Sequence, residues 1–120
     1  MTNRMLLLAA ILVGMTSGAV AQAKKATSIH GEIVDVIAFV SGSTKQEADA
    51  VTKSARAGNP LGLYDTKAKK LYIVGSTEVN KSPHEALIPY IGLRTFITGR
   101  IYSRNGINVI LMSDIGKSIK

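Results

Sequence analysis

The chain has 120 residues, a formal net charge of +7 at pH 7, and neither cysteine nor tryptophan. This length suits one domain, and the missing cysteines exclude disulfides, thiolate metal sites and lipid attachment through a cysteine. The positive charge is typical of proteins that bind anionic surfaces or polymers, although basic exported domains without such a role are also common.

The N-terminal segment has the three parts of an export signal. Arg4 gives a positive start, residues 5–15 form an apolar run of eleven, and residues 19–21 read Ala-Val-Ala, a small-residue cleavage pattern. The apolar run is shorter than the roughly 20 residues that span a bilayer. We therefore predict that residues 1–21 are a signal peptide. Residues 22–120 are predicted to be one domain, periplasmic or secreted, with no integral membrane association.

The first half of the predicted domain contains one long strand and one helix. Residues 29–40 are rich in Ile, Val and Phe and predict a strand, in which Gly31 permits a sharp bend. Thr44 and Glu47 then fit a capping box, which predicts a helix over residues 45–57. Ala48, Val51 and Ala55 share one face of this helix, and such small residues favour close packing against a sheet.

The second half reads as two pairs of strands separated by a short helix. Residues 60–64 and 69–75 predict two strands, and Ser82 followed by Pro83 predicts the start of a helix of little more than a turn or two. Residues 93–104 and 107–115 predict a hairpin, because Asn105–Gly106 suits a type I′ turn. The tail, residues 116–120, is predicted to fray.

This order of elements predicts the fold class. Five strands with a helix between the third and the fourth is the order of an OB-fold, a small Greek-key barrel. We therefore predict a mainly β protein with short helices: a five-stranded OB-fold-like Greek-key barrel with an inserted helix between strands 1 and 2.

Three short motifs carry a resemblance to a known family. They are Gly-Glu-Ile-Val-Asp at residues 31–35, Gly-Asn-Pro-Leu-Gly-Leu at residues 58–63 and Thr-Gly-Arg-Ile-Tyr at residues 98–102. The chain resembles small exported bacterial OB-fold-like domains whose members carry Cys-Tyr and His-x-x-Cys-Ala-x-x-Cys patterns. In this chain Ala38-Phe39 replaces the Cys-Tyr pair. On the predicted helix, Glu47, Ala50 and Ser54 replace the histidine and the two cysteines of the second pattern. The resemblance implies a divergent member that lacks every cysteine, so no metal site is carried over.

Residues for catalysis or metal binding are sparse. His30 and His84 lie in different predicted elements, whereas a transition-metal site needs three or four ligands, and no serine lies in a G-x-S-x-G elbow. Asp35 lies in an apolar strand, where burial would raise its pKa unless it lies at the sheet margin or pairs with an arginine. We predict a protein that is not an enzyme and that has no metal or cofactor. An enzyme built around Asp35 and His30 would need the two side chains to converge.

One face of the strand over residues 93–104 is the candidate binding surface. OB-folds bind oligonucleotides and oligosaccharides on an open face, using basic residues for charge and aromatic residues for stacking. The alternative is an ordinary solvated strand face whose long side chains cover apolar surface. The candidate ligand-binding residues on this face are Arg94, Phe96, Arg100, Tyr102 and Arg104. Lys70 joins them if the barrel brings its strand close to this face.

These observations predict an exported, soluble, non-enzymatic binding domain. Its partner would be an anionic ligand, namely a glycan, a lipid headgroup or an oligonucleotide, with nucleic acid disfavoured by the exported location. The alternative is a structural or protein-interaction subunit of a periplasmic or secreted assembly, docking by a sheet edge or by the helix face with Ala48, Val51 and Ala55. The oligomeric state is left open.

Overall fold

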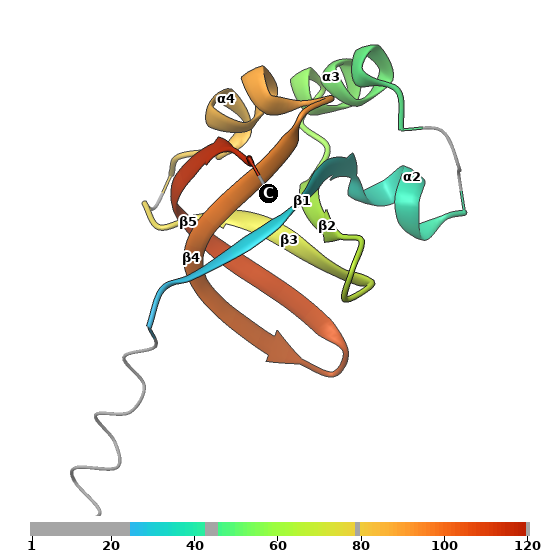
Figure 1. Ribbon diagram of the computed structural model, residues 1–120. Coiled ribbons are helices and arrows are strands. Elements are labelled where there is room, and N and C mark those ends of the chain that lie inside the picture. Colours follow the sequence, from blue (N-terminus) through green and yellow to red (C-terminus); the bar gives the residue numbers. More distant parts are fainter. Residues whose placement is uncertain (1–24, 43–45, 79, 120) are drawn as a thin grey trace, which may run out of the picture.

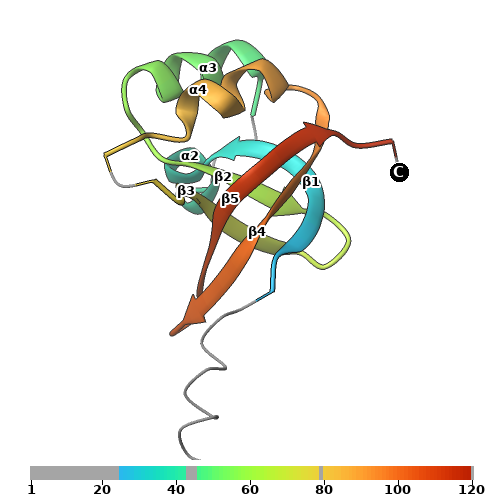
Figure 2. The ribbon, with the colours of Figure 1, turned by 90° about the vertical axis from the view of Figure 1, so that its left-hand side faces the viewer.

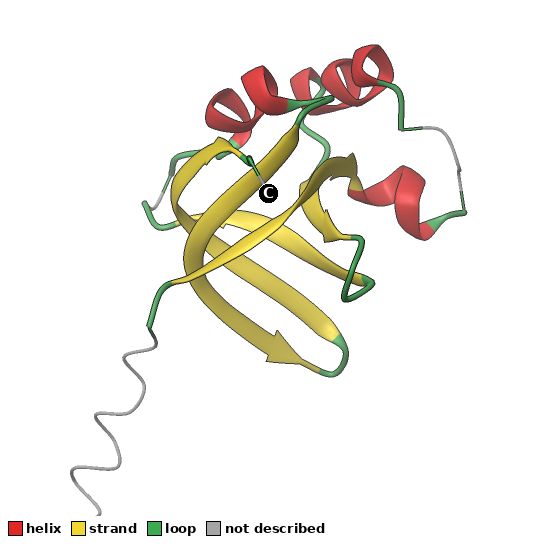
Figure 3. Cartoon of the chain, in the orientation of Figure 1, coloured by secondary structure: helices red, strands yellow, loops and turns green. Residues whose placement is uncertain are grey.

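Five strands form one sheet in the computed structural model, which describes residues 25–42, 46–78 and 80–119 (Figure 1). The protein is mainly β, and its helices are short (Figure 3). The strands are β1 (Thr27–Asp35), β2 (Leu61–Asp65), β3 (Lys70–Ser76), β4 (Arg94–Arg104) and β5 (Ile107–Lys117).

The strand pairings close on themselves. The order is β1-β2-β3-β5-β4, and β4 in turn pairs with β1, where Ile97 lies opposite Ile29. The pairing of β3 with β5 is parallel, and the other four pairings are antiparallel. Each strand therefore has two hydrogen-bonded neighbours, and the five form a ring.

Helices fill the connections on either side of β2 and β3. Helices α2 (Val36–Val40) and α3 (Ala48–Arg56) lie between β1 and β2, whereas α4 (His84–Leu87) and the 3₁₀ turn η1 (Ile88–Tyr90) lie between β3 and β4. Helices α3 and α4 lie side by side over one end of the ring (Figures 1 and 2). Within the described residues, no helix has the length and apolar character needed to cross a membrane.

The core lies inside the ring and beneath α3 and α4. Alternate residues of β4 point inward, so Thr95 and Ile97 are fully buried while Arg100 on the other face is exposed. Val51 and Ala55 of α3 and Leu87 of α4 close one end of this core. The buried cluster is Ile33, Val51, Ala55, Leu61, Leu63, Tyr72, Val74, Leu87, Ile97 and Ile110.

Two glycines allow neighbouring backbones to approach closely. A Cβ atom at Gly31 would collide with the carbonyl group of Tyr64, and one at Gly99 would collide with the carbonyl group of Leu111. The strand β4 also shifts its register with β5 between Thr98 and Gly99. Such bulges and glycines let strands bend sharply or approach each other closely. At Gly31 the structure shows the close approach, and the predicted bend stays a prediction.

The predicted first strand is wrong in its second half. Strand β1 ends at Asp35, and Val36–Val40 form helix α2 instead. The Asp35 carboxylate caps this helix by accepting hydrogen bonds from the amides of Ile37 at 3.0 Å and Ala38 at 3.3 Å. The cap overrides the strand preference of the β-branched residues. Two helices, rather than one, therefore separate β1 from β2.

The other predicted elements agree in type and differ at their ends. The predicted capping box depends on Thr44, which lies outside the described residues, and helix α3 begins at Ala48. The hairpin is confirmed: Asn105 and Gly106 have φ of 52° and 84°, as a type I′ turn requires. The predicted fraying of the tail is wrong for residues 116–118, because β5 continues to Lys117 and the Ser118 amide donates to the Arg94 carbonyl at 2.8 Å.

Candidate functional site

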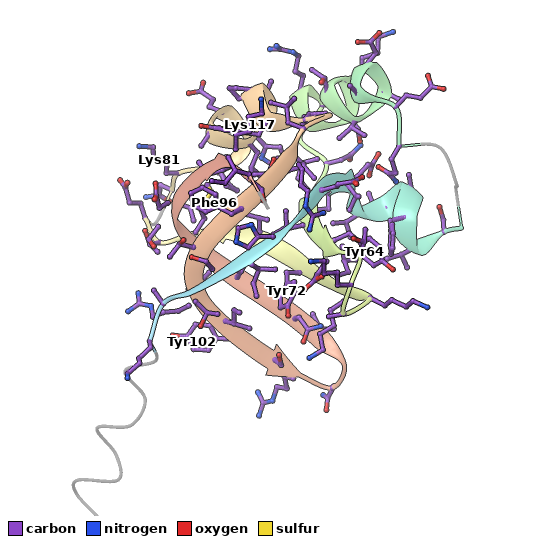
Figure 4. The ribbon with its side chains drawn as sticks, in the orientation of Figure 1. Tyr64, Tyr72, Lys81, Phe96, Tyr102 and Lys117 are labelled. Carbon is purple, nitrogen blue, oxygen red and sulfur yellow. The ribbon has the colours of Figure 1, made fainter. Side chains whose placement is uncertain are left out.

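The predicted basic face of β4 does point outward. Arg100, Tyr102 and Arg104 are exposed, and Arg94 and Phe96 are half-buried. Ten residues separate Arg94 from Arg104, which corresponds to roughly 33 Å along an extended strand. The side chains are therefore spread along the strand and do not form one compact site; Figure 4 shows Phe96 and Tyr102 well separated on β4.

Phe96 is built into the surface of the sheet. Its ring lies over Gly116 of β5, where a Cβ atom would collide with the ring. The ring centroids of Phe96 and His30 are 5.8 Å apart with a tilt of 42°. These two contacts give Phe96 a packing role, because the ring covers the gap that the glycine leaves.

Five of the six candidate residues, all except Phe96, line four separate hollows. Arg94 lines a hollow of about 240 Å³ beside His30, and Arg100 lines one of about 390 Å³ beside Ala26. Tyr102 and Arg104 share one of about 400 Å³ on one side of the hairpin. Lys70 lines one of about 330 Å³ on the other side. The structure thus brings Tyr102, Arg104 and Lys70 near one hairpin end and leaves the other three elsewhere.

The hollow that contains Lys70 lies where three segments meet. One wall is α2, the second is the start of β3 and the third is the tip of the β4–β5 hairpin (Figure 1). Most of its lining side chains are aliphatic, and two lysines are present. The lining residues that matter here are Val36, Val40, Lys69, Lys70, Ile73 and Ile107.

The same hairpin separates this hollow from the one that contains Tyr102 and Arg104. Ile107 lines both hollows. We call the two hollows together the hairpin-tip surface. Its cations are Lys69, Lys70 and Arg104, and none of the described residues that line it is acidic. The surface is therefore aliphatic in the middle and positive at its margins.

Helix α2 is fixed in place by several contacts. Gln46 accepts a hydrogen bond from the Asp35 amide at 2.8 Å, and the Val36 amide donates to the Pro60 carbonyl at 3.2 Å. The rings of Phe39 and Tyr64 contact each other in a tilted arrangement, with their centroids 4.7 Å apart and their planes at 46°. These contacts leave Val40, 71 % exposed, at the free side of the helix.

The hairpin tip is tied to β3 by side-chain hydrogen bonds. Asn108 donates from Nδ2 to the Leu71 carbonyl at 3.3 Å and accepts from the Ser103 hydroxyl at 2.6 Å. Asn108 therefore bridges β3 and β4, and the wall of the hollow is held at both ends. No local pattern predicts this bridge, because Asn108 and Leu71 are 37 residues apart in the chain.

The two histidines have separate hydrogen-bond partners. His84 Nε2 lies 2.6 Å from the Asn59 carbonyl, which can only accept, so this nitrogen carries a proton. Its Nδ1 contacts the Ser82 hydroxyl. His30 Nδ1 lies 2.7 Å from the hydroxyl of Ser118, a contact that no local pattern predicts because the two residues are 88 positions apart. Ser118 is 8 % exposed, so it faces the interior and offers little access to a substrate.

Asp35 and His30, the two residues of the catalytic alternative, do not lie together. Asp35 caps α2, and His30 lies five residues earlier on the same strand, roughly 17 Å away. The enzyme built around these two residues therefore lacks the convergence that it requires. Within the described part of the chain, no group of three or more His, Cys, Asp or Glu side chains could hold a metal ion.

Comparison with known proteins gives no relative for this chain. No family model matches it, and no curated protein and no solved structure is detectably similar to it. The resemblance that the three short motifs carry therefore stays a prediction.

Proposed function

We propose that this protein is an exported, non-enzymatic OB-fold domain that binds an anionic ligand at the hairpin-tip surface. The strand order β1-β2-β3-β5-β4, the parallel pairing of β3 with β5 and the helix between β3 and β4 support the OB-fold and its Greek-key barrel. Export is supported by the signal-like pattern of residues 1–21.

The observation that carries the proposed site is the meeting of α2, β3 and the β4–β5 hairpin around Lys69 and Lys70. OB-folds bind ligands on the face of their second and third strands, between the first and last interstrand loops. Here those loops contain α2 and the turn Asn105–Gly106, and both border the hollow. Two lysines beside a hollow without acidic lining residues favour an anionic ligand.

The experiment is thermal melting of the chain from Gln22 with heparin, a single-stranded oligonucleotide and glycerophosphate as separate probes. A ligand present at a hundred times its dissociation constant adds about 2.7 kcal/mol to the free energy of unfolding. We expect at least one anionic probe to raise the melting temperature, and we expect the rise to shrink at high salt because ions screen the attraction. No shift with any probe would contradict the proposal.

Two variants assign the site within this experiment. Lys69→Gln/Lys70→Gln should abolish the shift if the hairpin-tip surface binds the probe. Arg100→Ala, which removes a cation from the middle of β4, should then leave it nearly unchanged. The reverse result would move the site to the outer face of β4.

The alternative is a structural or protein-interaction subunit. The helix face and the sheet edge that the sequence suggested as docking sites do not support it, but other exposed aliphatic residues do. Val51 and Ala55 of α3 are buried in the core, and each strand has two neighbours, so neither that helix face nor a sheet edge is open. A protein partner would instead have to cover Ile37, Val40 and Ile107.

A further inference from the structure

Four of the six large exposed hydrophobic side chains in the described residues gather at the hairpin tip and on α2. The exposed fractions are 54 % for Ile37, 71 % for Val40, 57 % for Ile107 and 39 % for Tyr102. Ile37 and Val40 are three residues apart on α2 and so share a face. Val40 and Ile107 line the same hollow, although 67 positions separate them in the chain.

These side chains project from the ends of elements instead of lining an enclosed cavity. Val40 is the last residue of α2, and Ile107 directly follows the hairpin turn. Other residues fill the core of the ring, so these exposed side chains are not part of the core. Exposed apolar residues that gather in one place and are rimmed by polar residues are typical of an interaction surface.

Cations surround this aliphatic group. Lys69 and Lys70 line one side of Ile107, and Arg104 lines the other. Two described acidic residues lie close in the chain to this lining, and both carboxylates accept backbone hydrogen bonds. Asp65 accepts from the amides of Lys67 at 3.0 Å and Ala68 at 3.1 Å, and Asp35 caps α2. The charge that complements this arrangement is negative.

We propose that the hairpin-tip surface docks on an anionic lipid bilayer, with Val40 and Ile107 entering the interface while Lys69, Lys70 and Arg104 contact lipid phosphates. This inference rests on the proposed anionic-ligand function and names its ligand. Peripheral proteins bind membranes by this combination of shallow apolar burial and basic residues.

The composition of the surface favours a bilayer over a soluble polyanion. Oligonucleotide binding relies on several aromatic side chains on which bases stack, and of the residues that line this surface Tyr102 is the aromatic one. Aliphatic side chains such as Val40 and Ile107 gain nothing from a highly charged, hydrated polymer. They gain affinity when acyl chains cover them.

The test is co-sedimentation of the chain from Gln22 with vesicles of phosphatidylglycerol and phosphatidylcholine. The helices and strands of the described residues, and their buried cluster, lie between Thr27 and Lys117, so the chain from Gln22 keeps all of them and omits the apolar N-terminal run. We expect binding to mixed vesicles, no binding to pure phosphatidylcholine vesicles, and loss of binding at about 0.5 M salt, where the Debye length is only a few ångströms.

Two pairs of variants separate the apolar from the electrostatic contribution. Ile107→Ser should weaken vesicle binding about tenfold, and Ile119→Ser, which alters a 96 % exposed isoleucine beyond the opposite end of β5, should not. Lys69→Gln/Lys70→Gln should weaken binding about 25-fold, since each basic residue near an anionic surface contributes about fivefold. Lys53→Gln on α3 is the control for charge. Thermal melting of each variant excludes unfolding as the cause.

A parallel measurement with heparin keeps the two proposals distinguishable. Ile107→Ser should leave heparin binding unchanged, whereas the lysine variant should weaken it. Heparin binding without vesicle binding, or vesicle binding that Ile107→Ser leaves intact, would overturn the membrane inference and leave the proposed function standing. Absence of binding to heparin and to vesicles would overturn both.

Discussion

Tyr72 illustrates what one buried side chain contributes to stability. Its ring belongs to the core and is 7 % exposed. Burial raises the pKa of the Tyr72 phenol above its usual value of 10.0, and the nearby Asp65 carboxylate raises it further. Both effects disfavour the phenolate in the folded protein, so the native state holds this proton to a higher pH than the unfolded chain does.

This raised pKa predicts a loss of stability at alkaline pH. Below pH 10 the phenol is protonated in both the folded and the unfolded state, so its contribution to the free energy of unfolding does not change with pH. Above pH 10 the unfolded chain releases the proton first, and the free energy of unfolding falls. Urea denaturation between pH 8 and about 11 should show this fall. The fall should be smaller in Tyr72→Phe, whereas the exposed Tyr102→Phe is the matched control. Equal slopes for Tyr72→Phe and the unaltered chain would contradict the assignment.

Helix α2 is the element on which the proposed site depends. It supplies Val36 and Val40 to the hollow, and its position is set by the Asp35 cap and by the ring contact between Phe39 and Tyr64. A helix of five residues has little stability of its own. The cap and the tertiary contacts must therefore hold it, and their loss should disturb one wall of the hairpin-tip surface while the ring persists.

Replacing the cap tests this dependence. Asp35→Ala removes the acceptor for two amides and should lower the free energy of unfolding by about 1 kcal/mol. Binding of an anionic probe should weaken in the same variant. Asp35→Asn keeps an acceptor oxygen, and it should retain most of the stability; urea denaturation of both variants measures the difference. Similar losses in both would mean that the carboxylate charge matters more than the cap geometry.

At the scale of the whole molecule, local signals in the sequence predicted most of the strands. The Asn105–Gly106 turn and the alternation in β4 depend on neighbouring residues, and both are confirmed. The run at Val36–Val40 was misread, because its β-branched residues favour a strand while a single preceding aspartate caps a helix. Local composition does not reveal which of these two preferences wins.

The candidate site was predicted only in part, for the same reason. Lys70, Tyr102 and Arg104 were found from their types and alternation, and the structure places them near the hairpin tip. The hollow itself needs α2 beside the hairpin, and its hydrophobic residues come from segments distant in the chain. The contact of His30 with Ser118, which fastens the end of β5 to β1, is likewise invisible in the sequence.

The most direct test of the account is a titration of the ¹⁵N-labelled chain from Gln22 with heparin, followed by amide chemical shifts. We expect salt-sensitive shifts at Val40, Lys69, Lys70 and Ile107, with α3 unperturbed. Shifts confined to the outer face of β4, around Arg94 and Arg100, would contradict the proposed site. No shifts at any amide, with heparin or with the oligonucleotide and glycerophosphate probes in its place, would contradict the anionic-ligand function itself.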